Sequence, residues 1–586
     1  MADRLFDFVK GRYDSGPEEI LLAAKENGSW REYTVREAWE TAISMSIALQ
    51  EIGIDHVDLQ PEAQEKIAIL SANRPEWIIT DLAVQLCGAV LTPIYPTIAP
   101  AELAFVLQDA GVKKLFISGP ELYVRYKEVL SDLSHIFCFD PVQGQTDWKS
   151  LRSTKTAPEP GLTARILPET LATIIYTSGT TGNPKGVMLS HSNIVSNVTD
   201  SMPVFTFAKH GDRALSFLPL NHIFERMVTY IYINAGLSIW YAESMDTIGA
   251  NLLEVKPMVF CTVPRLLEKV YERIMTKGLE LKGIKRALFF WALELGKKFD
   301  NAKPTSFWYR LQLALANKLI FSKWREALGG RVKAIVTGSA ACQERLIRIF
   351  TAARVIIMEG YGLTETSPVI TVNHFETEDR RIGTVGPLIE HVEVMLAEDG
   401  EILCKGPNIM MGYYKNPEMT AEAMKDGWFH TGDIGQWVDQ RFLKITDRKK
   451  EIFKTSGGKY VAPQPIENKM RESPYIEQIM VIGSDRKFVS ALIVPSMLQV
   501  RKHLKDEGKT LPNGDDALIQ MPEVQSLIRA QLDKYNVHFN HVEQVKKFSL
   551  LAAEWTVNGG ELTPSLKVKR KVIEQKYAKL IEAMYD

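Results

Sequence analysis

The segment Thr173-Ile-Ile-Tyr-Thr-Ser-Gly-Thr-Thr-Gly-Asn-Pro-Lys-Gly186 decides how the rest of the chain is interpreted. Its β-branched beginning predicts a short buried strand, and the glycine- and hydroxyl-rich part that follows predicts a loop. Glycines let backbone N–H groups approach a ligand closely, hydroxyls add donors, and Lys185 adds a positive charge. Such a loop suits a polyphosphate. An ordinary P-loop NTPase is excluded, because Gly-x-x-x-x-Gly-Lys-Ser/Thr cannot be laid over this segment.

The stretch from Thr177 to Gly186 resembles the signature of the adenylate-forming enzymes, which include acyl-CoA synthetases, nonribosomal adenylation domains and beetle luciferases. A flexible surface turn with one lysine is the alternative, but such turns seldom carry four hydroxyls. The resemblance implies that the loop binds ATP phosphates through a run of neighbouring residues. These are Thr177, Ser178, Gly179, Thr180, Thr181, Gly182 and Lys185.

The bulk composition limits the class of protein. A chain of 586 residues exceeds one ordinary core, and 45% hydrophobic with 24% charged residues is typical of a soluble globular protein. A net charge of -1 gives no reason to expect a nucleic acid partner. The five cysteines lie far apart, without paired metal-ligand spacing, which fits a reducing compartment. We expect a cytoplasmic protein, with peripheral membrane association as the alternative, since neither a signal peptide nor a spanning run is found. Oligomeric state is not readable.

The order of predicted elements indicates an α/β fold. Residues 1–160 alternate helical and strand-like runs, with the buried pattern of parallel strands. Residues 383–445 are glycine-punctuated and strand-rich, which predicts a small β subdomain. We therefore expect a large domain over 1–449, built from α/β sheet subdomains and a small β-rich subdomain. A small mobile α+β domain over 450–586 should follow it.

Two further segments each end a predicted strand in a turn, at Val332–Ala341 and at Val355–Thr366. Both are similar to adenine-binding segments of the adenylate-forming enzymes. The resemblance implies that Gly338, Ser339 and Ala340 lie against the base, that Tyr361 and Gly362 follow with the ring stacked on it, that Thr364 bonds the phosphate and that Glu365 holds Mg²⁺. An aromatic face, a hydroxyl and a hard oxygen ligand within five residues also form a compact nucleotide-and-metal site in their own right.

The phrase Gly427-Trp-Phe-His-Thr-Gly-Asp-Ile-Gly435 resembles the ribose-binding segment of the same enzymes. A carboxylate that accepts both ribose hydroxyls is the natural role for Asp433. By resemblance, Arg448 also reaches the ribose. The charged run from Asp447 to Glu451 is a solvated turn in the alternative interpretation, which its place after Asp433 disfavours.

The resemblance implies two arrangements of the C-terminal part. Lys450 would be the hinge, and Lys454 and Gly457 would face the active site only when the thioester forms. Lys567, in the frame Pro-Ser-x-Lys-Val, would be the adenylation lysine that bridges carboxylate and phosphate.

The segment Ser216-Phe-Leu-Pro-Leu-Asn-His-Ile-Phe-Glu-Arg226 resembles a phrase of the long-chain fatty acyl-CoA synthetases that borders the acyl pocket. The resemblance makes His222 and Arg226 candidates for substrate contact. A histidine after a proline turn is more often structural, so both interpretations stay open. Some long-chain members carry a tryptophan gate just after this histidine, and Ile223 stands here instead.

Residues 282–325 are basic and aromatic, with ten Lys and Arg against two Asp and Glu. Ile284, Leu288, Trp291 and Leu295 share one helical face, which indicates an amphipathic helix. The segment is either a pair of ordinary helices with aromatics in the core, or an interfacial patch for anionic lipid. RNA binding is a third, weaker interpretation.

Together the motifs are typical of a long-chain fatty acid–CoA ligase that uses ATP, Mg²⁺ and coenzyme A and forms an acyl adenylate. A fatty acyl-AMP ligase that feeds a carrier protein and a ligase for shorter or aromatic acids are the nearest alternatives. A luciferase-like oxygenase and a non-enzymatic lipid scaffold are more distant ones. The resemblance implies the catalytic residues Lys567, Thr364, Glu365, Lys185 and Lys454.

Overall fold

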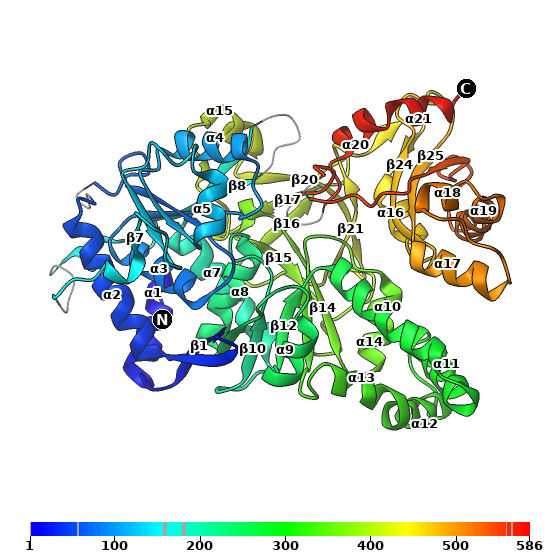
Figure 1. Cartoon of the computed structure of the whole chain (residues 1–586), viewed down its shortest axis with the longest axis horizontal. Coiled ribbons are helices and arrows are strands. Elements are labelled where there is room, and N and C mark those ends of the chain that lie inside the picture. The colour runs from blue at the N-terminus through cyan, green and yellow to red at the C-terminus, as the bar shows by residue number, and fades with distance from the viewer. Residues whose placement is uncertain (1, 55–57, 156–160, 178–182, 558, 564–566) are drawn as a thin grey trace.

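The structure is a computed structural model that describes the whole chain except residues 1, 55–57, 156–160, 178–182, 558 and 564–566. Two mainly parallel sheets and one antiparallel sheet occupy the chain up to residue 448. A smaller unit with its own sheet follows and lies to one side of them (Figure 1).

The first sheet has the order β18-β9-β8-β4-β3-β5-β6-β7 in the described chain. Its strands from β8 to β7 run parallel, whereas β9 is antiparallel to β8 and β18 is antiparallel to β9. The strands are β3 Lys66–Leu70, β4 Val90–Ile94, β5 Lys114–Ile117, β6 His135–Cys138, β7 Thr146–Asp147, β8 Leu171–Thr177, β9 Lys185–Ser190 and β18 Gly412–Tyr413.

The second sheet has the order β15-β14-β13-β12-β10-β11-β1-β2. All neighbours from β14 to β1 are parallel, and the two edge strands are antiparallel. The strands are β1 Ile20–Glu26, β2 Ser29–Thr34, β10 Arg213–Ser216, β11 Ser238–Tyr241, β12 Val259–Thr262, β13 Ala334–Thr337, β14 Ile356–Gly362 and β15 Val369–Val372.

Helices separate the two sheets and cover their outer faces. Ile67 and Ile69 of β3 point into a central core, whereas Ala68 and Leu70 point into an outer one, because successive strand residues face opposite sides. The central helices are α1 Leu5–Ser15, α2 Val35–Glu51, α3 Pro75–Leu86, α7 His191–Ser201 and α8 Ile223–Asn234. The outer helices are α4 Pro100–Ala110 and α5 Pro120–Tyr126 on the first sheet, and α9 Ile248–Val255, α10 Pro264–Glu280, α11 Gly283–Lys297, α12 Phe307–Ala316, α13 Ser322–Ala327 and α14 Glu344–Ala352 on the second.

Short elements fill the connections between these layers. The connection over residues 141–168 holds β7, a 3-10 turn η1 (Trp148–Ser150) and α6 (Leu162–Arg165). The other short helical elements are η2 Met202–Phe205, η3 Asn317–Phe321 and η4 Thr364–Thr366.

The predicted β subdomain at 383–445 is a five-stranded antiparallel sheet. It comprises β16 Glu393–Leu396, β17 Glu401–Lys405, β19 Met424–Lys425, β20 Trp428–Val438 and β21 Phe442–Arg448, with α15 Pro417–Ala423 beside it. Its strand β21 ends at Arg448, directly before the C-terminal unit.

The C-terminal unit is α+β and has apolar clusters on both faces of its sheet. Its elements are the hairpin β22 Phe453–Lys454 and β23 Tyr460–Val461, the sheet β24 Ile476–Ile482, β25 Ser490–Pro495 and β26 Lys547–Leu550, and the helices α16 Pro463–Met470, α17 Met497–Asp506, α18 Asp515–Ile519, α19 Pro522–Asn536, α20 Arg570–Lys576 and α21 Ala578–Ala583. The predicted fold class is confirmed. Among the helices that the structure describes, none is both long and apolar enough to cross a membrane.

Candidate functional site

The carboxyl ends of the parallel strands β13 and β14 begin the site, which is where open α/β sheets place their ligands. The turn Gly338, Ser339, Ala340 follows β13, and Ser339 has a left-handed φ of 68°. Glu359 of β14 fixes this turn, since its Oε1 accepts a hydrogen bond of 2.7 Å from the backbone N–H of Cys342. Burial raises the pKa of Glu359 to about 8.

Tyr361, Asp433 and Arg448 meet in one hydrogen-bonded group. The phenol of Tyr361 donates to Oδ2 of Asp433 at 2.8 Å, and Nε of Arg448 donates to Oδ1 at 3.0 Å. Asp433 and Arg448 are direct partners across β20 and β21, so the antiparallel register sets their approach. Two residues predicted to reach the ribose are thereby brought together with the one predicted to stack on the base.

Gly362 ends β14 where no side chain fits. A Cβ at this position would lie 1.7 Å from the backbone oxygen of Pro368. The glycine of the motif is therefore a packing requirement. The half-buried Thr364 and the buried Glu365 follow in η4, directly after this close approach.

Glu365 lies beside Lys185, the lysine of the glycine-rich segment. The Lys185 ammonium donates to Oε1 of Glu365 at 3.0 Å and to the Tyr413 hydroxyl at 2.7 Å, and Tyr413 donates to the same carboxylate oxygen at 2.9 Å. Burial opposes ionisation of Glu365, but the charge and hydrogen bond of Lys185 outweigh it and hold the pKa of Glu365 below its ordinary value. Glu365 is thus a carboxylate at neutral pH.

The donor set at Glu365 fits Mg²⁺. This ion prefers oxygen ligands, keeps several waters and is commonly held by one or two carboxylates together with substrate phosphates. Glu365 offers one ionised carboxylate beside Lys185, which belongs to the predicted phosphate-binding segment. A Mg²⁺ site whose remaining ligands are nucleotide oxygens is consistent with the prediction that Glu365 holds the ion.

The glycine-rich loop itself falls outside the described residues at Ser178, Gly179, Thr180, Thr181 and Gly182. Its two flanks are described. Thr177 ends β8 and Lys185 begins β9, and the two are direct partners in that hairpin. The hydroxyl of Thr177 is buried with no hydrogen-bond partner in the described chain, which leaves it available to a ligand.

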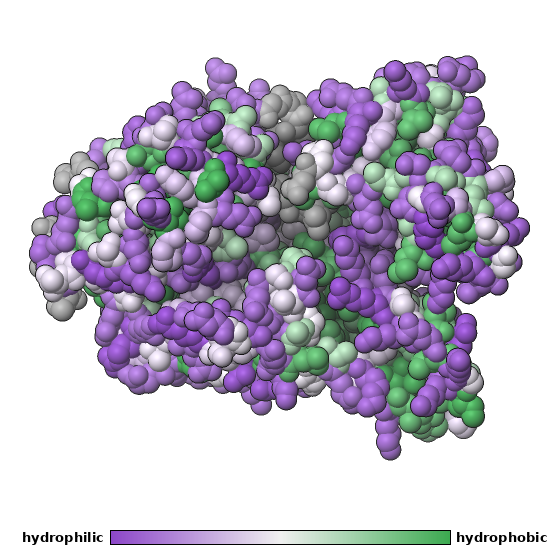
Figure 2. All heavy atoms as spheres, in the orientation of Figure 1, coloured by the Kyte–Doolittle hydropathy of each residue, from purple (hydrophilic) through white to green (hydrophobic). Residues whose placement is uncertain are grey.

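Lys567 brings the C-terminal unit to this group. Removal from water, followed by the charge of Arg448, lowers the pKa of Lys567 to about 8, while Asp433 and Glu365 act in the opposite direction. A cleft of about 1390 Å³ is lined by Ser339, Ala340, Tyr361, Gly362, Asp433, Arg448 and Lys567. Figure 2 shows the hollow between the larger part and the C-terminal unit.

The other C-terminal candidates lie away from the cleft. Lys450 is exposed in the turn after β21, and Lys454 and Gly457 are exposed in and beside the β22–β23 hairpin. The Lys454 ammonium lies 5.6 Å from the centre of the Tyr460 ring. This placement is what the two-arrangement hypothesis requires when Lys567 occupies the cleft.

His222 caps the start of α8. Its Nδ1 accepts a hydrogen bond of 3.2 Å from the backbone N–H of Phe224, so Nε2 carries the proton of the neutral ring. Burial lowers the pKa of His222 to about 4, and the charge of Lys567 acts in the same direction. A neutral donor therefore lies near Lys567, the predicted adenylation lysine.

Arg226, predicted as a second substrate contact, is fully buried between α8 and α3. Its guanidinium donates to both carboxylate oxygens of Asp81, at 3.0 and 2.5 Å, and stacks over Trp77. Asp81 also accepts from Tyr230 and Gln85. The geometry gives Arg226 a structural partner, and it favours a core role over substrate contact.

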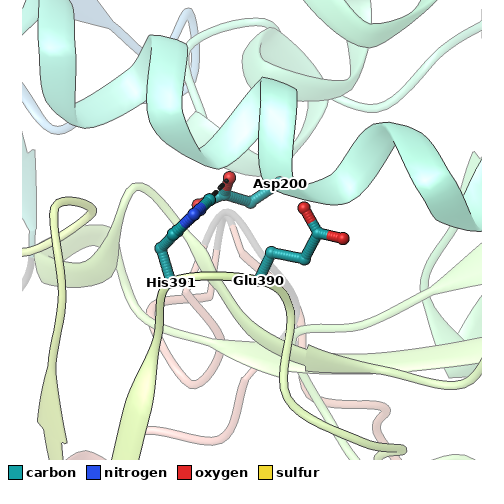
Figure 3. Close-up of side chains that lie close together, drawn as sticks. All are labelled: Asp200, Glu390 and His391. Atoms are coloured by element: carbon teal, nitrogen blue, oxygen red, sulfur yellow. Dashed lines mark hydrogen bonds and ion pairs between the residues drawn. The ribbon is translucent and has the colours of Figure 1, made fainter.

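One further group of side chains could offer metal ligands in the part of the chain that the structure describes: Asp200, Glu390 and His391. Asp200 comes from α7, and the other two come from the loop before β16 (Figure 3). Nδ1 of His391 lies 2.9 Å from Oδ1 of Asp200, and this contact raises the pKa of His391. We interpret the group as an ion pair that fastens the loop to α7.

Two contributors to the site were missed in the sequence. Tyr413 contacts both Lys185 and Glu365 from β18, and Glu359 supports the turn after β13. A signal existed for Glu359, because it is the one acidic residue in the apolar run that leads to Tyr361. Tyr413 had none, since its role depends on the pairing of β18 with β9.

Comparisons with known proteins agree with this geometry. The AMP-binding enzyme family matches residues 14–414, and the AMP-binding enzyme C-terminal domain matches residues 450–586. The long-chain-fatty-acid–CoA ligase FadD15 of Mycobacterium bovis is 34% identical over 97% of this chain and 95% of its own length. Human long-chain-fatty-acid–CoA ligase 6 is 32% identical over 89% of this chain and 78% of its own.

Solved structures share the fold at low sequence identity. An anthranilate CoA ligase in complex with anthranoyl-AMP superposes with a TM-score of 0.73 at 17% identity, covering 99% of this chain and 98% of its own. A fatty acyl CoA synthetase of Mycobacterium tuberculosis gives a TM-score of 0.65 at 20% identity, covering 99% of each chain. Family match, full-length relatives and shared fold lead to one conclusion: the chain belongs to the AMP-binding enzymes.

Proposed function

We propose that this protein is an AMP-forming long-chain fatty acid–CoA ligase, which activates its acid with ATP and transfers the acyl group to coenzyme A. The observation that carries the proposal is the cleft that Lys567 of the C-terminal unit shares with Tyr361, Asp433 and Arg448 of the larger part. The names of the full-length relatives support the long-chain acid as substrate.

In the first half-reaction a carboxylate oxygen of the acid attacks the α-phosphorus of ATP. A P–O bond to the acyl group forms, and the P–O bond to pyrophosphate breaks. The negative charge that develops between carboxylate and phosphate needs fixed positive charges and donors. We assign Lys567 to the carboxylate and α-phosphate, with Thr364 and Lys185 on the phosphates. Bound at Glu365, Mg²⁺ would neutralise part of the phosphate charge.

Asp433 and Arg448 would hold the ribose, and Tyr361 with the Gly338 turn would hold the adenine. Asp433 accepts one hydrogen bond on each oxygen, and an ionised carboxylate retains further lone pairs for two hydroxyls. Binding the non-reacting part of ATP in this way positions the α-phosphorus for attack.

In the second half-reaction the CoA thiol gives up its proton to solvent and its sulfur attacks the acyl carbon. A C–S bond forms, the acyl C–O bond breaks, and AMP leaves with the C–O electrons. We propose that residues 450–586 turn about Lys450 for this step and bring Lys454 and Gly457 to the cleft. A thiol nucleophile supplied by the substrate means that none of the chain's cysteines has to react. All five are buried, which agrees with this.

A panel of acids from acetate to stearate tests the proposal, with pyrophosphate release measured with and without CoA. We expect kcat/KM to rise with chain length and acyl-CoA to form at the rate of pyrophosphate release. Preference for short or aromatic acids would correct the substrate class. Accumulation of acyl adenylate that CoA does not discharge would identify an acyl-AMP ligase instead.

We also propose that the enzyme meets its acid at a membrane surface, as a peripheral protein. Long acyl chains partition into lipid at about 0.8 kcal/mol per buried CH₂, so the surface of a bilayer is where such an acid is concentrated.

A further inference from the structure

Helix α12 and the π-helical turn η3 carry an apolar face that no other part of the described chain covers. Phe307, Trp308, Leu311, Leu315 and Leu319 are between 44% and 68% exposed, and Ile284 at the start of the neighbouring helix α11 is 79% exposed. Figure 2 shows apolar side chains gathered over α11 and α12. Single exposed apolar residues are ordinary, but a contiguous group of this kind indicates a contact surface.

The exposed face is distinct from the one that holds the helix in place. Residues 307, 311 and 315 follow at intervals of four and so share one side of the helix. Tyr309, Leu313 and Ala316 lie on the other side and pack into the core beneath the second sheet. The helix is anchored through these residues, so its outward apolar residues do not serve the core.

Positive charge surrounds this face. Arg310 and Lys318 lie within the same turns as the apolar residues, and the segment 282–325 carries ten basic against two acidic residues in a chain of net charge -1. The exposed basic residues of the segment are Lys282, Lys285, Arg286, Lys297, Lys298, Lys303, Arg310, Lys318 and Lys323.

We infer that the face of α12 and η3 docks onto an anionic lipid surface, with the helix lying in the plane of the interface. Trp308 and the leucines would enter the boundary between headgroups and acyl chains, and Arg310 and Lys318 would contact the anionic headgroups. This inference rests on the proposed function, because the fatty acid that the enzyme would activate is concentrated in the lipid phase. It adds the docking element and the chemistry of the partner.

A second copy of the chain is a poorer occupant. A two-fold interface brings the same patch against itself, so Arg310 and Lys318 would face their own symmetry mates. Like charges brought together in a desolvated contact are unfavourable, whereas an anionic surface satisfies them.

The position of the face relative to the cleft also fits. Phe290 and Leu293 of α11, with Met275 and Leu279 of α10, line the same cleft as Asp433 and Lys567. Helix α12 packs against α11. Docking through α12 therefore brings the α10–α11 end of the cleft to the lipid surface.

Flotation of the full-length protein with phosphatidylcholine vesicles that contain increasing fractions of phosphatidylglycerol tests the inference, at low and at high NaCl. Binding should rise with phosphatidylglycerol and fall with salt. The triple variant Trp308→Gln/Leu311→Gln/Leu315→Gln should bind at least about 100-fold more weakly, since each large apolar side chain is worth more than about tenfold when buried. Arg310→Glu/Lys318→Glu should lose at least about 25-fold, because each basic residue contributes about fivefold.

Leu498→Gln and Lys505→Glu, on the exposed surface of α17, are the matched controls and should bind like the parent. Every variant should keep its pyrophosphate release on detergent-solubilised acid, because the changed residues lie outside the cleft. Binding that ignores phosphatidylglycerol and salt, or that survives both variants, overturns the inference. The inference is also overturned if the parent does not bind vesicles but forms a dimer, and the triple variant is monomeric. If the parent protein binds vesicles but releases no pyrophosphate, the proposed function is contradicted and the docking inference is not.

Discussion

Asp433 connects three predicted nucleotide residues through hydrogen bonds that the fold itself sets. Its oxygens accept from Tyr361 and Arg448, and it is buried in β20. A carboxylate so held presents its remaining lone pairs in fixed directions, which lowers the entropy lost when a ligand binds.

The first prediction follows from this arrangement. Asp433→Ala removes the acceptor for both ribose hydroxyls, and hydrogen bonds to a charged group are worth about 1.5–3 kcal/mol each. ATP affinity, measured by calorimetry, should fall at least about tenfold. Asp433→Asn, which keeps the shape and part of the acceptor capacity, should fall less. A folded Asp433→Ala protein with unchanged ATP affinity would rule out the ribose assignment.

Lys567 gives a second prediction, on pH. Its pKa is lowered to about 8, first by loss of hydration among the groups that line the cleft and then by Arg448, so the ammonium loses its proton as pH rises through about 8. Since the charged form is the one that helps adenylation, kcat/KM for pyrophosphate release should fall above about pH 8, and this parameter reports the free enzyme. Lys567→Arg stays charged, so it should be slower but lack that fall. An unchanged profile in the arginine variant would assign the titration to another group.

The order of the motifs along the sequence predicted most of the residues of this candidate site. Each motif specifies side chains, and these side chains come together once the fold brings the corresponding strand ends next to one another. Tyr361, Asp433, Arg448 and Lys567 do meet. What the sequence could not show is which polar groups partner one another inside the protein. Arg226 looked available for a substrate, but its partner Asp81 lies 145 positions away on another helix.

At the scale of elements, a buried polar group joins α8 to α3. Arg226 and Tyr230 of α8 bond Asp81 of α3, and His222 caps the same helix. The buried pair holds α8 against α3. A buried ion pair contributes little net stability, but removing one partner leaves an uncompensated charge.

Arg226→Ala should therefore destabilise the protein by about 3–5 kcal/mol, seen as a lower urea midpoint. The double variant Arg226→Met/Asp81→Leu, which removes both charges and keeps apolar volume, should recover most of that loss. The KM for the fatty acid should stay the same per folded molecule. Ordinary stability with a raised KM in Arg226→Ala would restore the substrate role instead.

Element types were readable wherever local pattern decides them, as in the strand at Lys66–Leu70 and the helix that Thr34 caps. The fate of the aromatic segment was not readable in the same way. Phe289, Phe321 and Trp324 are buried, whereas Phe307 and Trp308 are exposed, so the core interpretation of residues 282–325 holds for the first three, and the interfacial interpretation stays a prediction for the other two. Only tertiary packing separates the two groups, because both are apolar at helical spacing.

At the scale of the whole molecule, the C-terminal unit is held against the larger part by contacts beside the cleft. Arg265 of α10 pairs with Glu477 of β24, and Nε2 of Gln343 donates to the backbone oxygen of Arg471 at 3.4 Å. These polar links are few, and interfaces between domains of this kind allow relative motion. The arrangement observed places Lys567 in the cleft and Lys454 outside it, as the proposed adenylation role of Lys567 would require.

The final prediction separates the two half-reactions. Lys567 can act only where carboxylate meets phosphate, so Lys567→Ala should slow adenylate formation roughly a hundredfold or more, the usual scale for losing one preorganised electrostatic contact. Thioester formation from supplied acyl adenylate should survive. Lys450→Pro fixes φ in the turn after β21 and hinders the rotation that would bring Lys454 and Gly457 inward. It should still release pyrophosphate but fail to pass the acyl group to CoA, whereas Lys450→Ala, which leaves the backbone free, should do both. Rapid-quench measurement of each half-reaction in the three variants gives the six rates. If Lys567→Ala and Lys450→Pro lose both halves equally while folded, a single static site accounts for the chemistry better than a turning domain.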